Sequence, residues 1–87
     1  MVFLAITTNG LNDLLRVAAT IKASVWCGAD TITEADYANH QHQNLSRFSY
    51  ALGDRDESIL ADAVQTINEH HPGEVIWIEG ASVAHPG

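Results

Sequence analysis

Hydrophobic and polar positions follow two different periods along the chain, and these periods predict four strands and two helices. Short apolar runs rich in β-forming residues predict strands at residues 2–8, 23–27, 45–52 and 74–79. Apolar residues spaced three and four apart predict helices over residues 10–22 and from about residue 56 to residue 71. The turn-forming pairs Asn9-Gly10 and Pro72-Gly73 separate a strand from a helix in each half.

Residues 29–44, between the second and third predicted strands, have two interpretations. Thr31 with Glu34 matches a capping box and predicts a short helix through Tyr37 and Ala38. The same stretch also fits an extended hairpin arm. A connection of this length is more often functional or mobile than inert.

The order strand, helix, strand, strand, helix, strand resembles that of a ferredoxin-like sandwich. The resemblance covers most of the chain and is one of topology only. It implies a single α+β domain over residues 1–80, with two helices on one face of a four-stranded antiparallel sheet and a loose tail at residues 81–87. This fold carries many unrelated functions, so it implies no activity by itself.

Alternation along the predicted strands divides their side chains between two faces. The face toward the helices is expected to form the core and contains Leu4, Ile6, Phe48, Tyr50, Leu52, Ile76 and Ile78. The face that the helices leave uncovered is expected to contain Phe3, Ala5, Arg47, Ser49, Val75, Trp77 and Trp26. Aromatic side chains on an open face are typical of protein contacts, which makes Phe3, Trp26, Arg47 and Trp77 candidate partner-binding residues. Alternatively, the tail from Gly80 onward or the 29–44 arm covers this face.

The charge of the chain changes this picture by excluding one class of partner. Eleven carboxylates oppose four Lys and Arg residues, for a formal net charge of -7. The four basic residues are isolated from one another, so no basic stripe is available to bind phosphates. An RNA-binding module with aromatics on an open sheet is therefore disfavoured, and we expect no direct nucleic-acid binding.

The carboxylates are expected to gather at the two ends of the predicted sandwich. One acidic end combines Asp30, Glu34, Asp36, Glu69 and Glu74, with Asp13 nearby, and supplies further candidate partner-binding residues. The opposite end combines Asp54, Asp56 and Glu57 at the start of the second helix, where carboxylates cap free N–H groups and complement the helix dipole.

Candidate chemistry in the sequence is sparse. The histidines His40, His42, His70 and His71 are weak metal-ligand candidates, because neither pair has a zinc-signature spacing. Cys27, the only cysteine, lies in an apolar strand and is expected to be a buried, inert thiol. No catalytic spacing is present, and we expect no cofactor.

The lone cysteine excludes an intramolecular disulfide and favours a reducing compartment. No run approaches the length of a transmembrane helix, and the apolar start lacks the basic region of a signal peptide. The sequence thus predicts a soluble, cytoplasmic protein that does not bind membranes.

Three functions remain open on this basis. The first is a small acidic, non-enzymatic interaction protein, expected to be a homodimer. Its sharper form is an inhibitor that occupies a basic nucleic-acid-binding surface, because size and charge resemble small viral proteins that block bacterial defence systems. Length and element order also resemble Cas2-type ferredoxin-like dimers, which implies a metal-dependent nuclease or nucleic-acid scaffold, although the first strand ends on Thr7, Thr8 and Asn9 instead of an acidic residue. The third function is a metal-binding regulator that uses the histidines.

Overall fold

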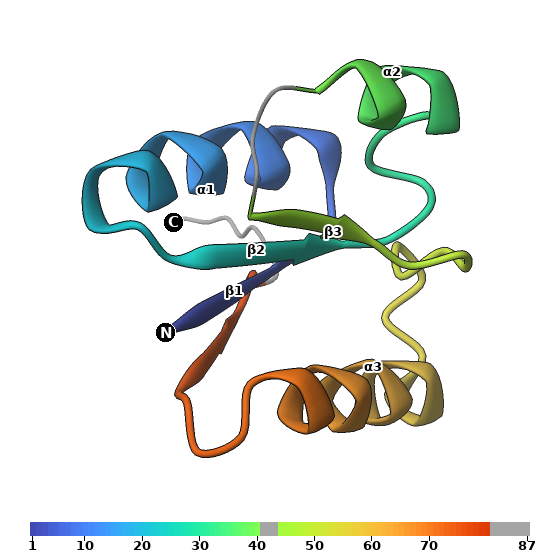
Figure 1. Cartoon of the computed structure of the whole chain (residues 1–87). Helices are drawn as coiled ribbons and strands as arrows, with labels where there is room; N and C mark the ends of the chain where they lie inside the picture. The colour runs from blue at the N-terminus through green and yellow to red at the C-terminus, as the bar shows by residue number, and fades with distance from the viewer. Residues whose placement is uncertain (41–43, 81–87) are drawn as a thin grey trace, which may run out of the picture.

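The chain alternates strands and helices, and a computed structural model describes residues 1–40 and 44–80 (Figure 1). In chain order the elements are β1 (Val2–Ala5), α1 (Thr8–Ile21), β2 (Ser24–Cys27), α2 (Glu34–Asn39), β3 (Leu45–Arg47), α3 (Glu57–His70) and β4 (Ile76–Ile78). The proposed tail at residues 81–87 and His42 lie outside the described residues.

All four strands are parallel, in the order β3-β2-β1-β4. The prediction of an antiparallel ferredoxin-like sheet with both helices on one face is therefore wrong. The physical reason is that the connection between β2 and β3 contains α2, and that β3 pairs parallel to β2 after it. Parallel strands require such a crossover of a dozen or more residues, whereas a tight hairpin would have reversed the strand direction. The third strand also ends at Arg47 and does not extend to residue 52.

Helices cover both faces of the sheet: α1 and α2 lie on one face and α3 lies on the other (Figure 1). The core on the α1 side consists of Phe3, Ala5, Leu11, Ala18, Ala23, Val25, Cys27 and Leu45. The core on the α3 side consists of Val2, Leu4, Ile6, Phe48, Leu52, Ala63 and Ile67. Strand alternation thus separated Leu4 and Ile6 from Phe3 and Ala5, but it assigned Trp26 to the wrong face, and the face expected to be uncovered is a second core. Parallel sheets are normally buried on both faces in this way.

Each helix begins at a side-chain cap. The Thr7 hydroxyl accepts a hydrogen bond from the Gly10 N–H at 3.0 Å, so α1 starts before the Asn9-Gly10 pair that was expected to precede it. Thr33, not Thr31, caps α2 by accepting from the Asp36 N–H. None of the helices in the described part of the chain is long and apolar enough to cross a membrane.

The carboxylate of Asp56 caps α3, which confirms the structural role expected for this residue. It accepts hydrogen bonds from the N–H groups of Ser58 and Ile59 and from the Ser58 hydroxyl. These bonds, the one from the Ser58 hydroxyl foremost, hold the pKa of Asp56 below its ordinary value.

Parallel strands bring all their carboxyl ends to one edge of the sheet, which we call the C-terminal edge. The first turns of α1, α2 and α3 lie at this edge because each helix follows a strand. The strand order reverses between β1 and β4, and open parallel sheets bind ligands beside such a reversal. The fold therefore directs attention to the C-terminal edge.

Candidate functional site at the C-terminal edge of the sheet

The C-terminal edge is strongly acidic. Seven of the eleven carboxylates lie in the loops and first helical turns at this edge: Asp30, Glu34, Asp36, Asp54, Asp56, Glu57 and Glu79. Asp13 lies farther along α1 and pairs with Arg16. The only guanidinium groups there are those of Arg47 and Arg55, and both bind backbone carbonyls. Negative charge therefore dominates the edge where a parallel sheet usually presents its binding site.

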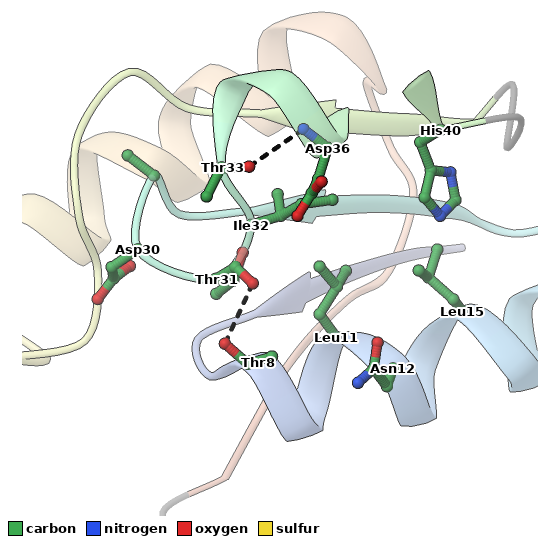
Figure 2. A pocket seen from close by; sticks show the side chains of 11 residues that line it. Thr8, Leu11, Asn12, Leu15, Asp30, Thr31, Ile32, Thr33, Asp36 and His40 are labelled. Atoms are coloured by element: carbon green, nitrogen blue, oxygen red, sulfur yellow. Dashed lines mark hydrogen bonds between the residues drawn. The ribbon is translucent and has the colours of Figure 1, made fainter. Parts of the chain in front are cut away.

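A hollow of about 520 Å³ opens at this edge between α1 and α2, and we call it the α2 hollow (Figure 2). Its lining consists of Thr8, Leu11, Asn12, Leu15, Ala29, Asp30, Thr31, Ile32, Thr33, Asp36 and His40. Figure 2 shows the carboxylate of Asp36 directed from α2 toward α1 across this space. Hydroxyl, amide and carboxylate groups thus share the hollow with an apolar floor.

The two aspartates of the α2 hollow differ in their hydrogen bonding. The carboxylate of Asp30 accepts from the N–H groups of Leu52 at 3.2 Å and Gly53 at 3.0 Å, and thereby ties the β2–α2 connection to the loop after β3. The carboxylate of Asp36 makes no hydrogen bond to another described residue. Its backbone N–H donates to the Thr33 hydroxyl. Asp30 is therefore structural, and Asp36 is the carboxylate available to a ligand.

Arg47 holds the wall of the α2 hollow from behind. Its guanidinium donates to the carbonyls of Ile32 at 2.8 Å and Ala29 at 3.0 Å. The side chain is half-buried, and its guanidinium is the hydrogen-bond donor to these two backbone carbonyls. Arg47 was expected to bind a partner from an open sheet face. In the structure its guanidinium instead holds the backbone of residues 29 and 32.

A second hollow, of about 610 Å³, lies on the other side of α1 and is lined by Thr7, Asn9, Gly10, Asp13, Leu14, Arg55 and Glu79. We call it the Glu79 hollow. The carboxylate of Glu79 accepts hydrogen bonds from the Ile6 N–H at 2.7 Å, the Thr7 N–H at 2.8 Å and the Thr7 hydroxyl at 2.6 Å. These donors join β4 to the start of α1 across 72 positions of sequence.

The electrostatics of the Glu79 hollow favour an ionised carboxylate. Burial acts to raise the pKa of Glu79, but the hydrogen bonds from Thr7 and Ile6 and the charge of Arg55 outweigh it, so the pKa lies below its ordinary value. Arg55 itself donates to the carbonyls of Glu79 and Gly80, each at 2.9 Å. It does so from a left-handed backbone conformation, with φ of 55°, that few non-glycine residues adopt.

Gly10 permits this arrangement. A Cβ atom at this position would lie 2.0 Å from Oε1 of Glu79, which is closer than any non-bonded contact allows. The absence of a side chain therefore lets the carboxylate lie directly over the first turn of α1.

The aromatic residues expected on an open face lie in three different environments. Phe3 is buried beneath α1, with 8% of its surface exposed. Trp26 is half-buried on the α3 side, where its Nε1–H donates to Nε2 of His71 at 3.3 Å and its ring contacts those of Phe48 and His70. Only Trp77, which is 56% exposed, presents its ring to solvent.

The expected acidic end is divided between two edges of the sheet. Asp30, Glu34 and Asp36 lie at the C-terminal edge, whereas Glu69 and Glu74 lie near the end of α3 and before β4, at the opposite edge. Glu74 there pairs with His71 and with the amino group of Met1. The expected grouping is wrong because it followed antiparallel strand directions, and the same error placed the Asp54 to Glu57 turn at the far end.

The histidine candidates are also divided. His40 ends α2 on the α1 side, and His70 and His71 end α3 on the other face of the sheet. Within residues 1–40 and 44–80, no three His, Cys, Asp or Glu side chains are placed to hold a metal ion. Parallel topology thus separates the two groups that antiparallel topology was expected to bring together.

Cys27 is fully buried in β2. Burial raises the pKa of its thiol, and the opposing effects of a hydrogen bond with Thr31 and the charge of Arg47 are smaller. The thiol is therefore protonated at neutral pH and packs as a small apolar group.

Several residues that build the edge were not identified from the sequence, above all Thr7, Thr33, Arg55 and Glu79. Thr7 and Thr33 each precede a helix and match the N-cap preference, so a local signal existed for both. The pairing of Glu79 with Thr7 had no local signal, since it depends on β4 lying beside β1.

Comparisons with protein-family models, with curated proteins and with solved structures found no match to this chain.

Proposed function

We propose that this protein is a small acidic, non-enzymatic interaction module whose C-terminal edge binds a basic surface of another protein. The observation that supports the proposal is the concentration of seven carboxylates at this edge, with both of its guanidinium groups already bound to backbone carbonyls. A field of one sign at a hollowed edge attracts groups of the opposite sign and accelerates their association.

The same edge is poorly suited to phosphate groups. Nucleotide-binding parallel sheets place a phosphate over the first turn of the helix that follows β1. Here the carboxylate of Glu79 lies over that turn and takes the N–H donors of Ile6 and Thr7. A nucleotide or nucleic-acid backbone would meet carboxylates in place of donors, which favours a protein partner.

The α2 hollow fits the side chain of a lysine or arginine from such a partner. Its volume of about 520 Å³ exceeds that of one long basic side chain, its floor of Leu11, Leu15 and Ile32 suits the methylene stem, and the carboxylate of Asp36 lies above it. In the sharper form of the proposal, the partner is a protein with a basic nucleic-acid-binding surface, and this chain inhibits it by occupying that surface.

Charge-matched variants test the proposal. Glu34→Gln with Asp36→Asn removes two charges beside the α2 hollow, and Asp62→Asn with Glu69→Gln removes two exposed charges from α3. The tagged full chain and both variants are used to capture partners from the native host, and mass spectrometry identifies the captured proteins. We expect the first variant to lose a basic partner that the second retains, and we expect rising salt to weaken its binding.

Equal loss in both variants would show that net charge alone attracts the partner and would contradict a site at the C-terminal edge. Recovery of no basic protein by the unmodified chain would contradict the proposal as a whole. Thermal melting of each variant confirms that the loss does not come from unfolding.

We assign the module to the cytoplasm as part of the same proposal. The single cysteine is buried in β2 and no disulfide supports the fold, which is typical of proteins from a reducing compartment.

A further inference from the structure

The outer edge of β4 carries unpaired backbone groups within the described part of the chain. The hydrogen bonds Val2 N–H to Val75 carbonyl and Glu79 N–H to Leu4 carbonyl show which residues of this segment face β1. Since strand residues alternate, Ile76 and Ile78 direct both their N–H and their carbonyl groups away from β1. In the sheet order β3-β2-β1-β4, no described strand pairs with that side.

The side chains around this edge are apolar and exposed. Val75 is 59% exposed, Trp77 56% and Ile78 44%, and none of the charged or proline residues that usually protect an edge strand lies within β4. On α1, the row that begins with Leu14 in the Glu79 hollow continues through Val17 and Ile21, which are 48% and 49% exposed. Trp77 is in register with Phe3 and so lies on the α1 face of the sheet, whereas Ile78 is in register with Leu4 and lies on the α3 face. Exposed apolar side chains therefore lie on both faces of the edge strand.

We propose that two copies of this chain pair through β4, antiparallel and about a two-fold axis at Trp77. A two-fold axis brings the same segment of both copies together, and with the axis at Trp77 the segment Ile76-Trp77-Ile78 pairs only apolar residues with one another. Ile76 of one copy faces Ile78 of the other, and the two residues exchange both hydrogen bonds. The two-fold axis generates the same pair of hydrogen bonds between Ile78 of the first copy and Ile76 of the second. The two four-stranded sheets thereby form one continuous sheet.

The antiparallel arrangement also separates the acidic edges of the two copies. It places the C-terminal edge of one copy beside the opposite edge of its partner, where Lys22, His70 and His71 accompany Glu69 and Glu74. The five residues from Val75 to Glu79 span roughly 17 Å. The two acidic edges are therefore separated by more than the screening length of about 8 Å at physiological salt. A parallel pairing would bring the two acidic edges together, so the charge distribution favours the antiparallel pair.

The exposed apolar area indicates how strong the pairing is. Five half-exposed side chains offer on the order of 300 Å² of apolar surface per copy. With the strand backbone and the rim, the interface lies at the lower end of specific interfaces, near or below about 1,200 Å² in total. The dimer is therefore expected to form in the micromolar range, and its test must span concentrations.

Cysteine cross-linking tests the register directly. Trp77→Cys places two thiols at a non-hydrogen-bonded antiparallel pair, where Cα atoms lie about 4.5 Å apart, within the range of about 4.4–6.8 Å that a disulfide requires. Val75→Cys is the matched control, because the axis sets Val75 opposite Glu79 of the other copy. Under mild oxidation of the full chain we expect a dimer band for the first variant and little for the second. Cys27 is buried and does not take part.

Sedimentation of the unmodified chain from low to high micromolar concentration measures the mass directly. We expect a shift from 9.4 kDa to twice that mass. Ile78→Pro removes the outward N–H and leaves the bonds to β1 in place, so we expect it to weaken the dimer at least about tenfold without lowering the melting temperature by more than a few degrees.

A monomer at every concentration, with no Trp77→Cys cross-link, would overturn the proposal and assign the edge to another segment of the chain or to a different protein. Equal cross-linking of Val75→Cys would overturn the register. Neither result bears on the α2 hollow, whose lining includes no residue of β4 or of the proposed interface.

Discussion

The two hollows beside the first turn of α1 use their carboxylates in opposite ways. In the Glu79 hollow, the carboxylate takes three donors from Ile6 and Thr7, and Arg55 fixes the neighbouring carbonyls. In the α2 hollow, Asp36 makes no such bond to the described residues. The carboxylate of the first hollow is therefore already bound by the protein's own donors, and the carboxylate of the second is not. The comparison shows that carboxylates at the same edge of the sheet can differ in whether the fold already supplies their hydrogen-bond donors.

The largest expected effect concerns Arg47, which holds the wall of the open hollow. Arg47→Met retains the apolar stem but leaves the carbonyls of Ala29 and Ile32 without their charged donor. We expect a loss of about 2–3 kcal/mol in the free energy of unfolding, measured by urea denaturation. Arg16→Met is the control, because Arg16 is exposed and pairs only with Asp13. Equal stability of the two variants would contradict the structural role of Arg47.

A smaller effect is expected for Glu79, whose carboxylate lies in the other hollow. Glu79→Gln replaces an ionised acceptor with an amide, and we expect a loss of about 1 kcal/mol because the site is partly open to solvent. The pKa of Glu79 is lowered in the folded state, so its stabilisation is present above the unfolded pKa of about 4.3 and is lost as the pH falls through the lower folded value. Melting temperatures of the two proteins should therefore differ at pH 7 and converge in acid. A difference in melting temperature that does not change with pH would contradict a lowered pKa of Glu79 in the folded state. Glu69→Gln, at an exposed position, is the control.

The smallest net effect is expected at Gly10, where two contributions oppose each other. Gly10→Ala forces the Glu79 carboxylate to move, but alanine improves the helix by up to about 1 kcal/mol. We expect a net loss below about 1 kcal/mol that changes to a gain when Glu79→Ala is present. A double-mutant cycle in urea measures this coupling. Additive changes would show that Gly10 and Glu79 are independent.

Local patterns in the sequence were sufficient to locate most of the elements. The apolar runs near residues 2–8, 23–27 and 74–79 contain β1, β2 and β4. The periodic stripes contain α3 and cover all of α1 except its first two residues. Alternation also separated Leu4 and Ile6 from Phe3 and Ala5, which do belong to different cores. These features depend on neighbours within a few residues, so the sequence carries them directly.

The direction of the strands was not accessible in the same way. It depended on whether residues 29–44 return as a hairpin or cross the sheet, and either is compatible with their composition. In the structure this connection contains a helix of six residues, Glu34–Asn39, and β3 follows it parallel to β2. With that one change, Glu69 and Glu74 move to the edge opposite Asp36, and the face expected to be open becomes a second core.

The sequence by itself determined the charge, the amphipathic stripes and the helix caps of this protein, because these depend on composition and on short-range spacing. Only the tertiary structure decided where the charge lies. Glu79 meets Thr7 across 72 positions because β4 pairs with β1, and Asp36 lies over α1 because a crossover places α2 there. Contacts of that separation depend on strand direction, which no short-range pattern specifies.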